Sequence, residues 1–563
     1  MASSYAPKTM NYAWVIDQRK CIGCHACTTA CKSENEVPLS VDRTWVKYVE
    51  KGTFPNVQRH FGVLRCNHCA NPPCVHICPV TAMFQRPDGV VEFDKDACIG
   101  CKACIAACPY DAIYIDPEDG TAAKCNFCSH RLDVGLEPAC VVVCPEEALI
   151  FGDLEDPNSR VSQLVGREKT QVRKPEKNTD PKCFYIGADE AVLNPDVQTH
   201  DESGLYMWSL QRQEKHGATL DNNRPSGLSL SAALNTVTGA RVAYDVHHDI
   251  PWGPKVSLYL WTKSMAAGAF LMAWLVWAVG RMGHAFPSPL TLGMGGPTIE
   301  MFGIKLSTSS PDWIYWLGPL LASIALAATG ALLVADLDRP ERFWRILARP
   351  QWKSWLAIGS FIILGYSLLL AALLGLQLAG PAVRATAIWS VLFHLAMPAA
   401  TMTAIYTAFL FAQAKGRDLW QSPMLPLHLL VQAIIAGACV TAISAPVVHD
   451  TAGVGGLCDV VLVAALVMHV FLILVGEIWT EHSSKAKQRA ISLMVSGPYS
   501  GLFWGGAILA GVAVPLALLV GQMSGMGVLP ATLLEPVAAL SALAGLLAYE
   551  HCFVMAGQSI RLS

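Results

Sequence analysis

Residues 98–112 read CIGCKACIAACPYDA, and this stretch decides the fold of the first half of the chain. Its four cysteines have the spacing C-x2-C-x2-C-x3-C, and a proline follows the fourth. Three thiolates on one tight loop can hold three irons of a cubane cluster, while a fourth cysteine at the start of a helix reaches a second cluster. The stretch therefore predicts a ferredoxin-like unit that binds 4Fe-4S clusters.

Similar motifs occur four times between residues 21 and 145. The first repeats the spacing of 98–112, the second reads C-x2-C-x4-C-x3-C-P, and the fourth carries an eleven-residue insertion in its middle. In motif order the cysteines are Cys21, Cys24, Cys27 and Cys31; Cys66, Cys69, Cys74 and Cys78; Cys98, Cys101, Cys104 and Cys108; and Cys125, Cys128, Cys140 and Cys144. Together they predict four 4Fe-4S clusters in two ferredoxin-like units.

Two other uses of these sixteen cysteines stay open. Disulfides are disfavoured because the start of the chain, MASSYAPKTMNYAW, lacks the basic and apolar regions of a secretory signal peptide. Zinc suits C-x2-C pairs, but zinc modules rarely place three cysteines so close together before a fourth cysteine and a proline. Iron-sulfur clusters are the preferred interpretation.

Charge divides the 563-residue chain near residue 250. The first 250 positions carry 25 basic and 32 acidic residues, and the remaining 313 carry only 16 and 12. Such a fall in charge is typical of a change from water-exposed to lipid-facing surface. No basic patch with interleaved aromatic residues stands out, so nucleic acid is not an expected partner.

These patterns predict an α+β bis-ferredoxin-like domain over 1–155, a connecting strap over 156–250 and an all-α transmembrane bundle over 251–563. The stretches VVEFD at 90–94 and AIYID at 112–116 alternate as short strands do. The strap is polar, shows no sustained period and is predicted to be irregular. Its single cysteine, Cys183, is expected to be a buried structural thiol.

Eight apolar runs of the second half are long enough to cross a bilayer, which takes about 20 helical residues. The predicted spans are 257–280, 313–335, 354–379, 386–412, 424–446, 457–479, 500–522 and 531–556. An even number of spans puts the N-terminal domain and the C-terminus on one side. Loops on that side hold eleven Lys and Arg against three on the other, so the iron-sulfur domain is expected at the cytoplasmic face of a bacterial inner membrane.

The phrases CNHCANPPCVHICP and CIGCKACIAACPYDA, with the motif order and the long fourth motif, resemble the four-cluster subunit of molybdopterin oxidoreductases such as polysulfide and dimethyl sulfoxide reductases. The resemblance covers about 1–155 and implies which cysteines share a cluster. The implied sets are Cys21, Cys24, Cys27 with Cys144; Cys125, Cys128, Cys140 with Cys31; Cys66, Cys69, Cys74 with Cys108; and Cys98, Cys101, Cys104 with Cys78. It also implies a separate molybdopterin-containing catalytic subunit docked on this domain.

The phrases PWGPKVSLYLWTKSMAAGAF at the first span and DLDRPERFW at 336–344 resemble the polysulfide reductase membrane-subunit family, also called NrfD-like. That resemblance implies eight helices, a bound quinone and no haem. It places the quinone, menaquinone or ubiquinone, at the membrane face nearest the iron-sulfur clusters. The chain is thus interpreted as a fusion of an electron-transfer subunit with a quinone-binding membrane subunit.

A quinone head needs hydrogen-bond donors and a proton supply in an otherwise apolar slot. Polar residues at the predicted cytoplasmic ends of the spans are candidates, and we expect Tyr259, Lys263, Ser264, Asp336, His428 and Glu477 to serve this role. Glu550 and His551 lie at the same level of the last span. Ionisable groups in a bilayer usually have a task or a partner, so ion pairs that only lock helices together remain an alternative for each.

Deeper polar residues suggest a second role. A proton path across the membrane is predicted from Glu477 through His469, Asp459 and His394, which lie at successive depths. His449 and Asp450 lie toward the opposite side. Two histidines on two helices also allow a b-type haem, but the depths of His394 and His469 do not match, so no haem is expected.

The sequence thus predicts an electron conduit that reduces quinone for a catalytic partner on another chain, since no G-x-G-x-x-G follows a strand here. Three alternatives stay open: a quinol-oxidising subunit of a sulfur-compound or oxyanion reductase, a proton translocator resembling alternative complex III, and a plain anchor. Oligomeric state is open between a single copy and a dimer of the whole complex.

Overall fold

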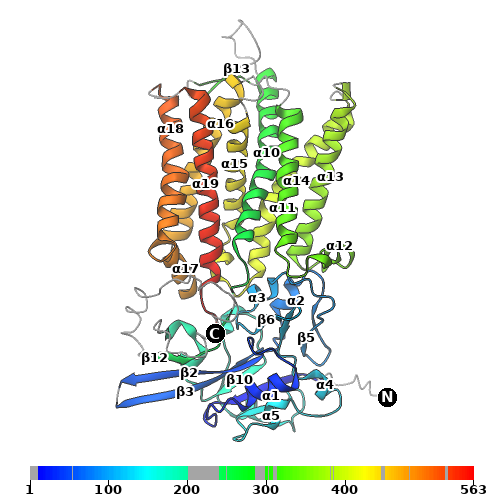
Figure 1. The fold of residues 1–563 in the computed structure, drawn as a ribbon, viewed down its shortest axis with the longest axis vertical. Helices are drawn as coiled ribbons and strands as arrows, with labels where there is room; N and C mark the ends of the chain where they lie inside the picture. The colour runs from blue at the N-terminus through cyan, green and yellow to red at the C-terminus, as the bar shows by residue number, and fades with distance from the viewer. Residues whose placement is uncertain are drawn as a thin grey trace, which may run out of the picture.

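The computed structural model describes residues 10–53, 55–200, 240–248, 250–285, 298–301, 304–307, 313–380, 382–383, 386–444, 451–480, 482, 484–525 and 530–563. Figure 1 shows a long upright helix bundle standing on an N-terminal domain of short strands and helices, with the C-terminus at the junction between them.

A four-stranded sheet forms the base of the N-terminal domain, in the order β8-β1-β10-β9. Its strands are β1 (Tyr12–Asp17), β8 (Leu149–Asp153), β10 (Cys183–Ile186) and β9 (Thr170–Gln171). Strand β1 pairs antiparallel with β8 and parallel with β10. The side chains of Trp14 and Ile16 point into the main core, which also holds most of the cysteines.

A second four-stranded sheet, in the order β11-β12-β2-β3, extends to one side (Figure 1). It is built on a long hairpin of β2 (Thr44–Thr53) and β3 (Asn56–Arg65), with Thr44 opposite Arg65. Strands β11 (Thr199–His200) and β12 (Ala240–Tyr244) complete it. The inner end of β3 is buried and its outer end exposed, so the hairpin enters the core only where it approaches the cysteine motifs.

Two small hairpins confirm the predicted short strands. Strand β4 (Met83–Gln85) pairs with β5 (Val91–Phe93), and β6 (Ile113–Ile115) pairs with β7 (Ala122–Lys124). Short helices carry or adjoin the cysteines: α1 (Ala26–Glu34), α2 (Pro73–Ile77), α3 (Ala103–Ala107), α4 (Ser129–Leu132) and α5 (Ala139–Val142). The predicted ferredoxin-like units are present.

The described part of 156–250 differs from the irregular strap that the sequence predicts. It contains α6 (Arg160–Arg167), α7 (Glu190–Leu193) and four strands that complete both large sheets. These strands have two to five residues each, too short to show a period in the sequence. Cys183 is fully buried in β10, as expected.

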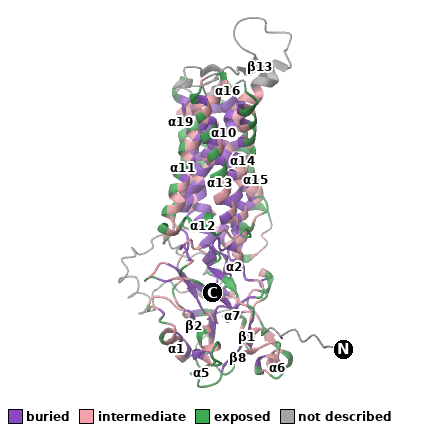
Figure 2. Cartoon of the chain, turned by 90° about the vertical axis from the view of Figure 1, so that its right-hand side faces the viewer, coloured by how far each residue is buried: buried purple, intermediate pink, exposed green. Residues whose placement is uncertain are grey.

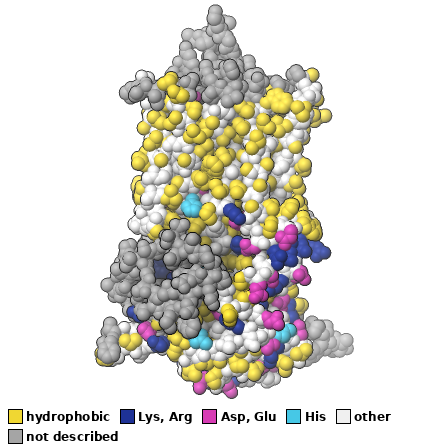
Figure 3. Space-filling model, viewed as in Figure 1, with side chains coloured by type: hydrophobic (Ala, Val, Ile, Leu, Met, Phe, Trp, Pro, Cys, Tyr) yellow, Lys and Arg dark blue, Asp and Glu magenta, His cyan; other side chains and the backbone are white. Residues whose placement is uncertain are grey.

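The predicted bundle of eight spans is confirmed. Among the described residues, eight helices are long and apolar enough to cross a membrane. They are Pro254–Val279, Ile314–Ala335, Trp355–Leu378, Ala387–Gln413, Leu425–Ser444, Gly456–Trp479, Leu502–Met523 and Leu533–Gln558. The space-filling view shows hydrophobic side chains over the bundle and charged ones over the junction and the domain below it (Figure 3).

The helices that form these spans are α10 (Pro254–Ala285), α11 (Gly318–Ala335), α13 (Trp355–Leu378), α14 (Ala387–Gln413), α15 (Leu425–Ser444), α16 (Thr451–Phe471), α18 (Val514–Met523) and α19 (Ala531–Gln558). Three of them, α13, α14 and α15, have the same bounds as their spans, and the others differ from theirs. Segments Trp313–Leu317, Leu472–Trp479 and Leu502–Ala513 are π-helical continuations. Short helices α12 (Arg345–Ala348) and α17 (Lys485–Val495) lie at the junction.

Small residues let the central helices approach closely. Gly268 of α10 faces Gly437 of α15 so tightly that a Cβ on either would collide with the other backbone. Buried residues run along the axis of the bundle and continue into the domain below (Figure 2). One buried cluster contains both cysteine ligand candidates and bundle residues such as Trp420 and Tyr549, so the two halves share a core.

Candidate functional site

The sixteen motif cysteines lie in four sets. We call them set 1 (Cys21, Cys24, Cys27, Cys144), set 2 (Cys31, Cys125, Cys128, Cys140), set 3 (Cys66, Cys69, Cys74, Cys108) and set 4 (Cys78, Cys98, Cys101, Cys104). The four thiols of set 1, of set 2 and of set 4 each line one pocket. The thiols of set 3 act on one another electrostatically. These are the groupings that the family resemblance implies.

The sets fit a cluster better than a single ion. No group of three or more His, Cys, Asp or Glu in the described ranges is arranged to hold one metal ion, whereas zinc draws its thiolates to about 2.3 Å from one centre. Backbone amides already point at the sulfurs: Gly100 N and Ala122 N each lie 3.4 Å from Cys98 Sγ, and Ala148 N lies 3.2 Å from Cys144 Sγ. Such N–H donors stabilise iron-sulfur clusters.

Backbone conformation positions the ligand loops. Gly23 and Gly100 occupy equivalent places in the first and third motifs, with φ of 71° and 68°. A Cβ at Gly23 would collide with the Phe61 ring, and one at Gly100 with Asp338 and the Gly120 carbonyl. The loop then turns through a left-handed residue, His25 or Lys102, into helix α1 or α3. Glycine is therefore needed at both loops.

Burial makes these thiols unfavourable as free anions. It raises the pKa of the Cys27 thiol to about 11 and that of Cys31 to about 12. A buried thiolate needs a metal or another positive partner. The chemistry of the sets therefore matches iron coordination.

The sets form a sequence through the domain. Cys24 of set 1 is exposed to solvent. Helix α1 carries Cys27 of set 1 and Cys31 of set 2 four residues apart. Cys125 of set 2 interacts with Cys66 of set 3, and Cys74 of set 3 with Cys104 of set 4.

Set 4 lies against the membrane bundle. Trp252 Nε1, just before α10, donates to the carbonyl of Cys101 at 3.2 Å, and Arg342 Nη1 donates to the carbonyl of Cys98 at 2.9 Å. The Asp338 amide donates to the Gly100 carbonyl at 3.3 Å. The DLDRP segment thus touches the loop of set 4 directly.

Lys263 is fully buried in α10 of the bundle. Its Nζ donates to the Ala404 carbonyl at 2.9 Å and to Thr407 Oγ1 at 2.8 Å. Glu550 of α19 is buried too, and both the Lys263 charge and the Ser264 hydroxyl act on its carboxyl group. We call Lys263 and Glu550 the buried polar pair; these two described residues interact electrostatically without a close ion pair.

Three more quinone candidates lie around this pair. Ser264 follows Lys263, and Tyr259 lies one turn before it; both are buried. Asp336, at the C-terminal end of α11, is half-buried and interacts with Tyr259. His551 contacts Ser257 through Nδ1 and Oγ at 3.3 Å. The structure therefore gathers Tyr259, Lys263, Ser264 and Asp336 at the end of the bundle nearest set 4.

The other two quinone candidates, His428 and Glu477, belong to a different cluster. His428 Nε2 lies 2.9 Å from His469 Nδ1, and His428 Nδ1 lies 3.2 Å from Glu477 Oε1. Tyr549 OH donates to both carboxylate oxygens of Glu477 at 2.8 and 2.9 Å. All four side chains are buried. We call His428, His469, Glu477 and Tyr549 the His-Glu-Tyr network.

The remaining proton-path candidates are not joined to this network. Asp459 lies ten residues before His469 on α16, a rise of about 15 Å, and interacts with Glu535 instead. His394 is exposed on the bundle, and its Nδ1 lies 2.6 Å from the Ser390 carbonyl of its own helix. His449 and Asp450 lie outside the described residues.

Two residues of these sites, Tyr549 and Arg65, are not predicted from the sequence. Tyr549 is missed because one tyrosine in an apolar helix usually packs in the core. Arg65 is missed as well, although its place directly before Cys66 is a signal: its Nη1 donates to Cys140 Sγ at 3.2 Å. Both are fully buried.

Family comparisons cover both halves. The model described as "Polysulphide reductase, NrfD" matches residues 245–561. Two models described as "4Fe-4S dicluster domain" match residues 13–79 and 57–154.

Curated relatives match the first third of the sequence. A tetrathionate reductase subunit of Salmonella typhimurium is 47% identical over 188 residues, which are 33% of this chain and 75% of the relative. A polysulfide reductase polypeptide of Wolinella succinogenes is 43% identical over 178 residues, 31% of this chain and 93% of the relative. The arsenate respiratory reductase iron-sulfur subunit ArrB of Shewanella sp. is 37% identical over 225 residues, 31% of this chain and 96% of the relative.

Proposed function

This protein belongs to the polysulphide reductase NrfD family and carries 4Fe-4S dicluster domains in front of the membrane bundle, and from this premise we propose that it conducts electrons between a catalytic partner and a membrane quinone. Sets 1 to 4 would each hold one 4Fe-4S cluster, and the clusters would supply one-electron transfer. The preferred direction is reduction of menaquinone or ubiquinone. The reverse, oxidation of a quinol for a sulfur-compound or oxyanion reductase, uses the same residues.

The contact between set 4 and the bundle carries this proposal. Thiolate sets run from the exposed Cys24 to Cys101, whose carbonyl accepts the Trp252 hydrogen bond. A conduit needs one accessible end and one end at the membrane, and the chain supplies both.

Tyr259, Lys263, Ser264 and Asp336 are proposed to bind the quinone head near set 4, with Glu550 beside them. Lys263 has donors for a quinone carbonyl, and Asp336 lies at the membrane surface where a proton can enter. Glu550 is buried beside Lys263 and Ser264, and its carboxyl group can also accept a hydrogen bond from a quinol hydroxyl. Such convergent polar groups in apolar surroundings suit a quinone.

The partner is proposed to be a molybdopterin-containing catalytic subunit docked near set 1. The three relatives named above are subunits of tetrathionate, polysulfide and arsenate reductases, so an absent catalytic chain is expected. By the excess of Lys and Arg in the loops beside the iron-sulfur domain, this domain would face the cytoplasm at the inner membrane.

A second function, redox-driven proton translocation, is favoured by the His-Glu-Tyr network. Hydrogen bonds link four buried titratable groups within the bundle, and such linked groups inside a membrane often mark proton relays. His428, Glu477 and His469 would then carry protons rather than bind quinone, with Asp459 as a separate step and His394 outside the route. A Glu477→Gln variant with an unchanged proton-to-electron ratio in liposomes would contradict this role.

The following experiment distinguishes a defect in the quinone site from a defect in the iron-sulfur clusters. The complex is purified with its partner, and Lys263→Ala is compared with Lys485→Ala, whose lysine is exposed on α17. We expect Lys263→Ala to lower the rate of quinone reduction at least tenfold, while the EPR signals of reduced clusters match the wild type. The control variant should keep the wild-type rate of quinone reduction and the wild-type EPR signals. Full quinone reduction in Lys263→Ala would reject this residue as part of the site.

A further inference from the structure

Arg65 connects three thiolate sets. It is the last residue of β3, directly before Cys66 of set 3, and it is fully buried. Its Nη1 donates to Cys140 Sγ of set 2 at 3.2 Å, and its charge also acts on Cys27 of set 1. The guanidinium carbon lies 4.3 Å from the centroid of the Trp14 ring, which holds it from the other side. Arg65 is therefore fixed within the electron path.

The charge of Arg65 is directed at the thiolates. Its Nε and Nη2 are buried without a hydrogen-bond partner in the described part of the chain. An arginine guanidinium keeps its positive charge in proteins at any physiological pH. The guanidinium thus stays positive, and its remaining donors are available to the group that these thiolates hold.

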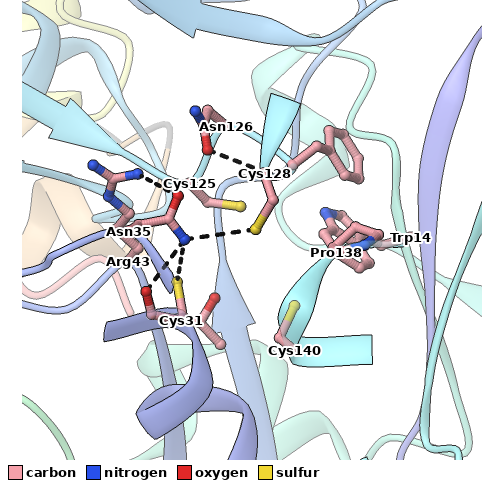
Figure 4. A pocket seen from close by; sticks show the side chains of 11 residues that line it. Trp14, Cys31, Asn35, Arg43, Cys125, Asn126, Cys128, Pro138 and Cys140 are labelled. Carbon is pink, nitrogen blue, oxygen red and sulfur yellow. Dashed lines mark hydrogen bonds between the residues drawn. The ribbon is translucent and has the colours of Figure 1, made fainter. Parts of the chain in front are cut away.

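Set 2 has a second source of positive charge. Asn35 Nδ2 points at Cys128 Sγ, 3.5 Å away, and at Cys31 Sγ, 3.8 Å away (Figure 4). Arg43 Nη1 in turn donates to Asn35 Oδ1 at 3.1 Å. Both side chains line the set 2 pocket, so Arg43 polarises the amide that faces the sulfurs.

Set 4 contrasts with set 2. The donors to Cys98 Sγ are the backbone amides of Gly100 and Ala122. The cation that lines the set 4 pocket, Lys102, is neutralised by an ion pair with Asp338 at 2.8 Å. The sulfur of Cys98 in set 4 thus receives neutral hydrogen bonds, and the Arg342 guanidinium reaches the Cys98 carbonyl and not the sulfur. Cys140 Sγ of set 2, by contrast, accepts directly from the buried guanidinium of Arg65.

We propose that Arg65 is a positioning residue that raises the reduction potential of the cluster held by set 2 above that of the cluster held by set 4. The inference rests on the proposed function, because it requires a 4Fe-4S cluster at set 2. Reduction adds one negative charge to a cluster, and a cation fixed in a low-dielectric interior stabilises the reduced form more than the oxidised form. Transfer from set 2 toward set 4 is then uphill for an electron that moves toward the membrane and downhill for one that moves outward.

Redox titration of the whole chain, followed by EPR, tests this role. The variants are Arg65→Met, which removes the charge at similar size, and Arg65→Lys, which keeps it. Arg59→Met is the matched control, because Arg59 lies on the same strand and its side chain is 52% exposed. A Cys140→Ala variant identifies the set 2 signal by its loss. Arg65→Met is expected to lower the equilibrium constant for reduction of that cluster at least tenfold, about 59 mV for one electron.

Each outcome is informative. Wild-type potentials in Arg65→Met with all clusters present would overturn the inference while leaving the conduit intact. Wild-type protein without any 4Fe-4S signal would instead reject the proposed function. If Arg65→Met does not assemble the set 2 cluster, the Arg65→Lys variant is the test. A set 2 reduction potential near that of the wild type supports the role of charge. A tenfold fall in the equilibrium constant for reduction of the set 2 cluster rejects it. A set 2 potential below that of set 4 in the wild type also overturns the proposal.

Discussion

The indole of Trp252 and the backbone carbonyl of Cys101 are joined by a 3.2 Å hydrogen bond. Trp252 stacks on Trp420 with ring centroids 5.3 Å apart and lies two residues before α10, the helix that carries Lys263. One side chain thus links the thiolate set nearest the membrane to the polar cluster proposed for quinone. Contacts within one chain therefore fix the position of the iron-sulfur domain relative to the bundle.

Trp252→Phe should weaken this junction. The variant removes the hydrogen bond and part of the ring stack, and we expect a loss of about 1–2 kcal/mol of stability, since a buried hydrogen bond contributes about 1 kcal/mol and an aromatic pair a similar amount. Thermal unfolding in detergent measures it. Trp344→Phe is the control, because Trp344, which directly precedes α12 at the junction, is 54% exposed. Equal melting temperatures for the two variants would contradict a structural role for Trp252.

Cys24→Ala and Cys183→Ala should differ sharply. Cys24 belongs to set 1, so its loss should remove about a quarter of the bound iron, one cluster of four. Cys183 is buried in β10 outside the four sets, so its variant should keep the full iron content with a modest loss of stability. Iron analysis and EPR of reduced protein provide the measurement. A cluster lost from Cys183→Ala would mean that the ligand sets are assigned wrongly.

Lys263 and Glu550 should show energetic coupling. Replacing Lys263 by Met removes the charge that acts on the buried Glu550 carboxyl, and we expect a loss of about 1–3 kcal/mol of stability, the cost of leaving a buried polar group uncompensated. The double variant Lys263→Met with Glu550→Gln should recover part of that loss, because the uncompensated charge is gone. A double-mutant cycle on unfolding in detergent gives the coupling. Additive effects would show that the two charges do not stabilise each other.

Removing iron should unfold the N-terminal domain before the bundle. Four thiols from distant parts of the sequence converge in each of three pockets of this domain, so cluster binding should supply much of its folding free energy. After chelation under reducing conditions, proteolysis should cut within 10–200 while the helical circular dichroism of the bundle persists. Proteolytic resistance of the iron-free domain would show instead that its sheets fold alone.

The fold was largely predictable. Cysteine spacing marked the ferredoxin-like units, and eight apolar runs marked the spans, because both signals are local in the sequence. The strands of the strap were missed because β9 and β11 have two residues each and are stabilised by pairing with distant strands. The membrane sites were predicted less completely, because polar residues at similar depth were assigned to one quinone site. In the structure, the neighbouring residues Tyr549 and Glu550 of α19 belong to different clusters.

The sequence alone determined that this protein binds iron-sulfur clusters and spans a membrane, because ligand spacing and apolar run length are properties of short segments. Only the tertiary structure decided how the polar residues combine. It joined His428, Glu477 and His469 with Tyr549, left His394 apart, and set Arg65 against Cys140 from 75 residues away. Such groupings depend on helix rotation and strand pairing, which are fixed by packing between segments that no local pattern connects.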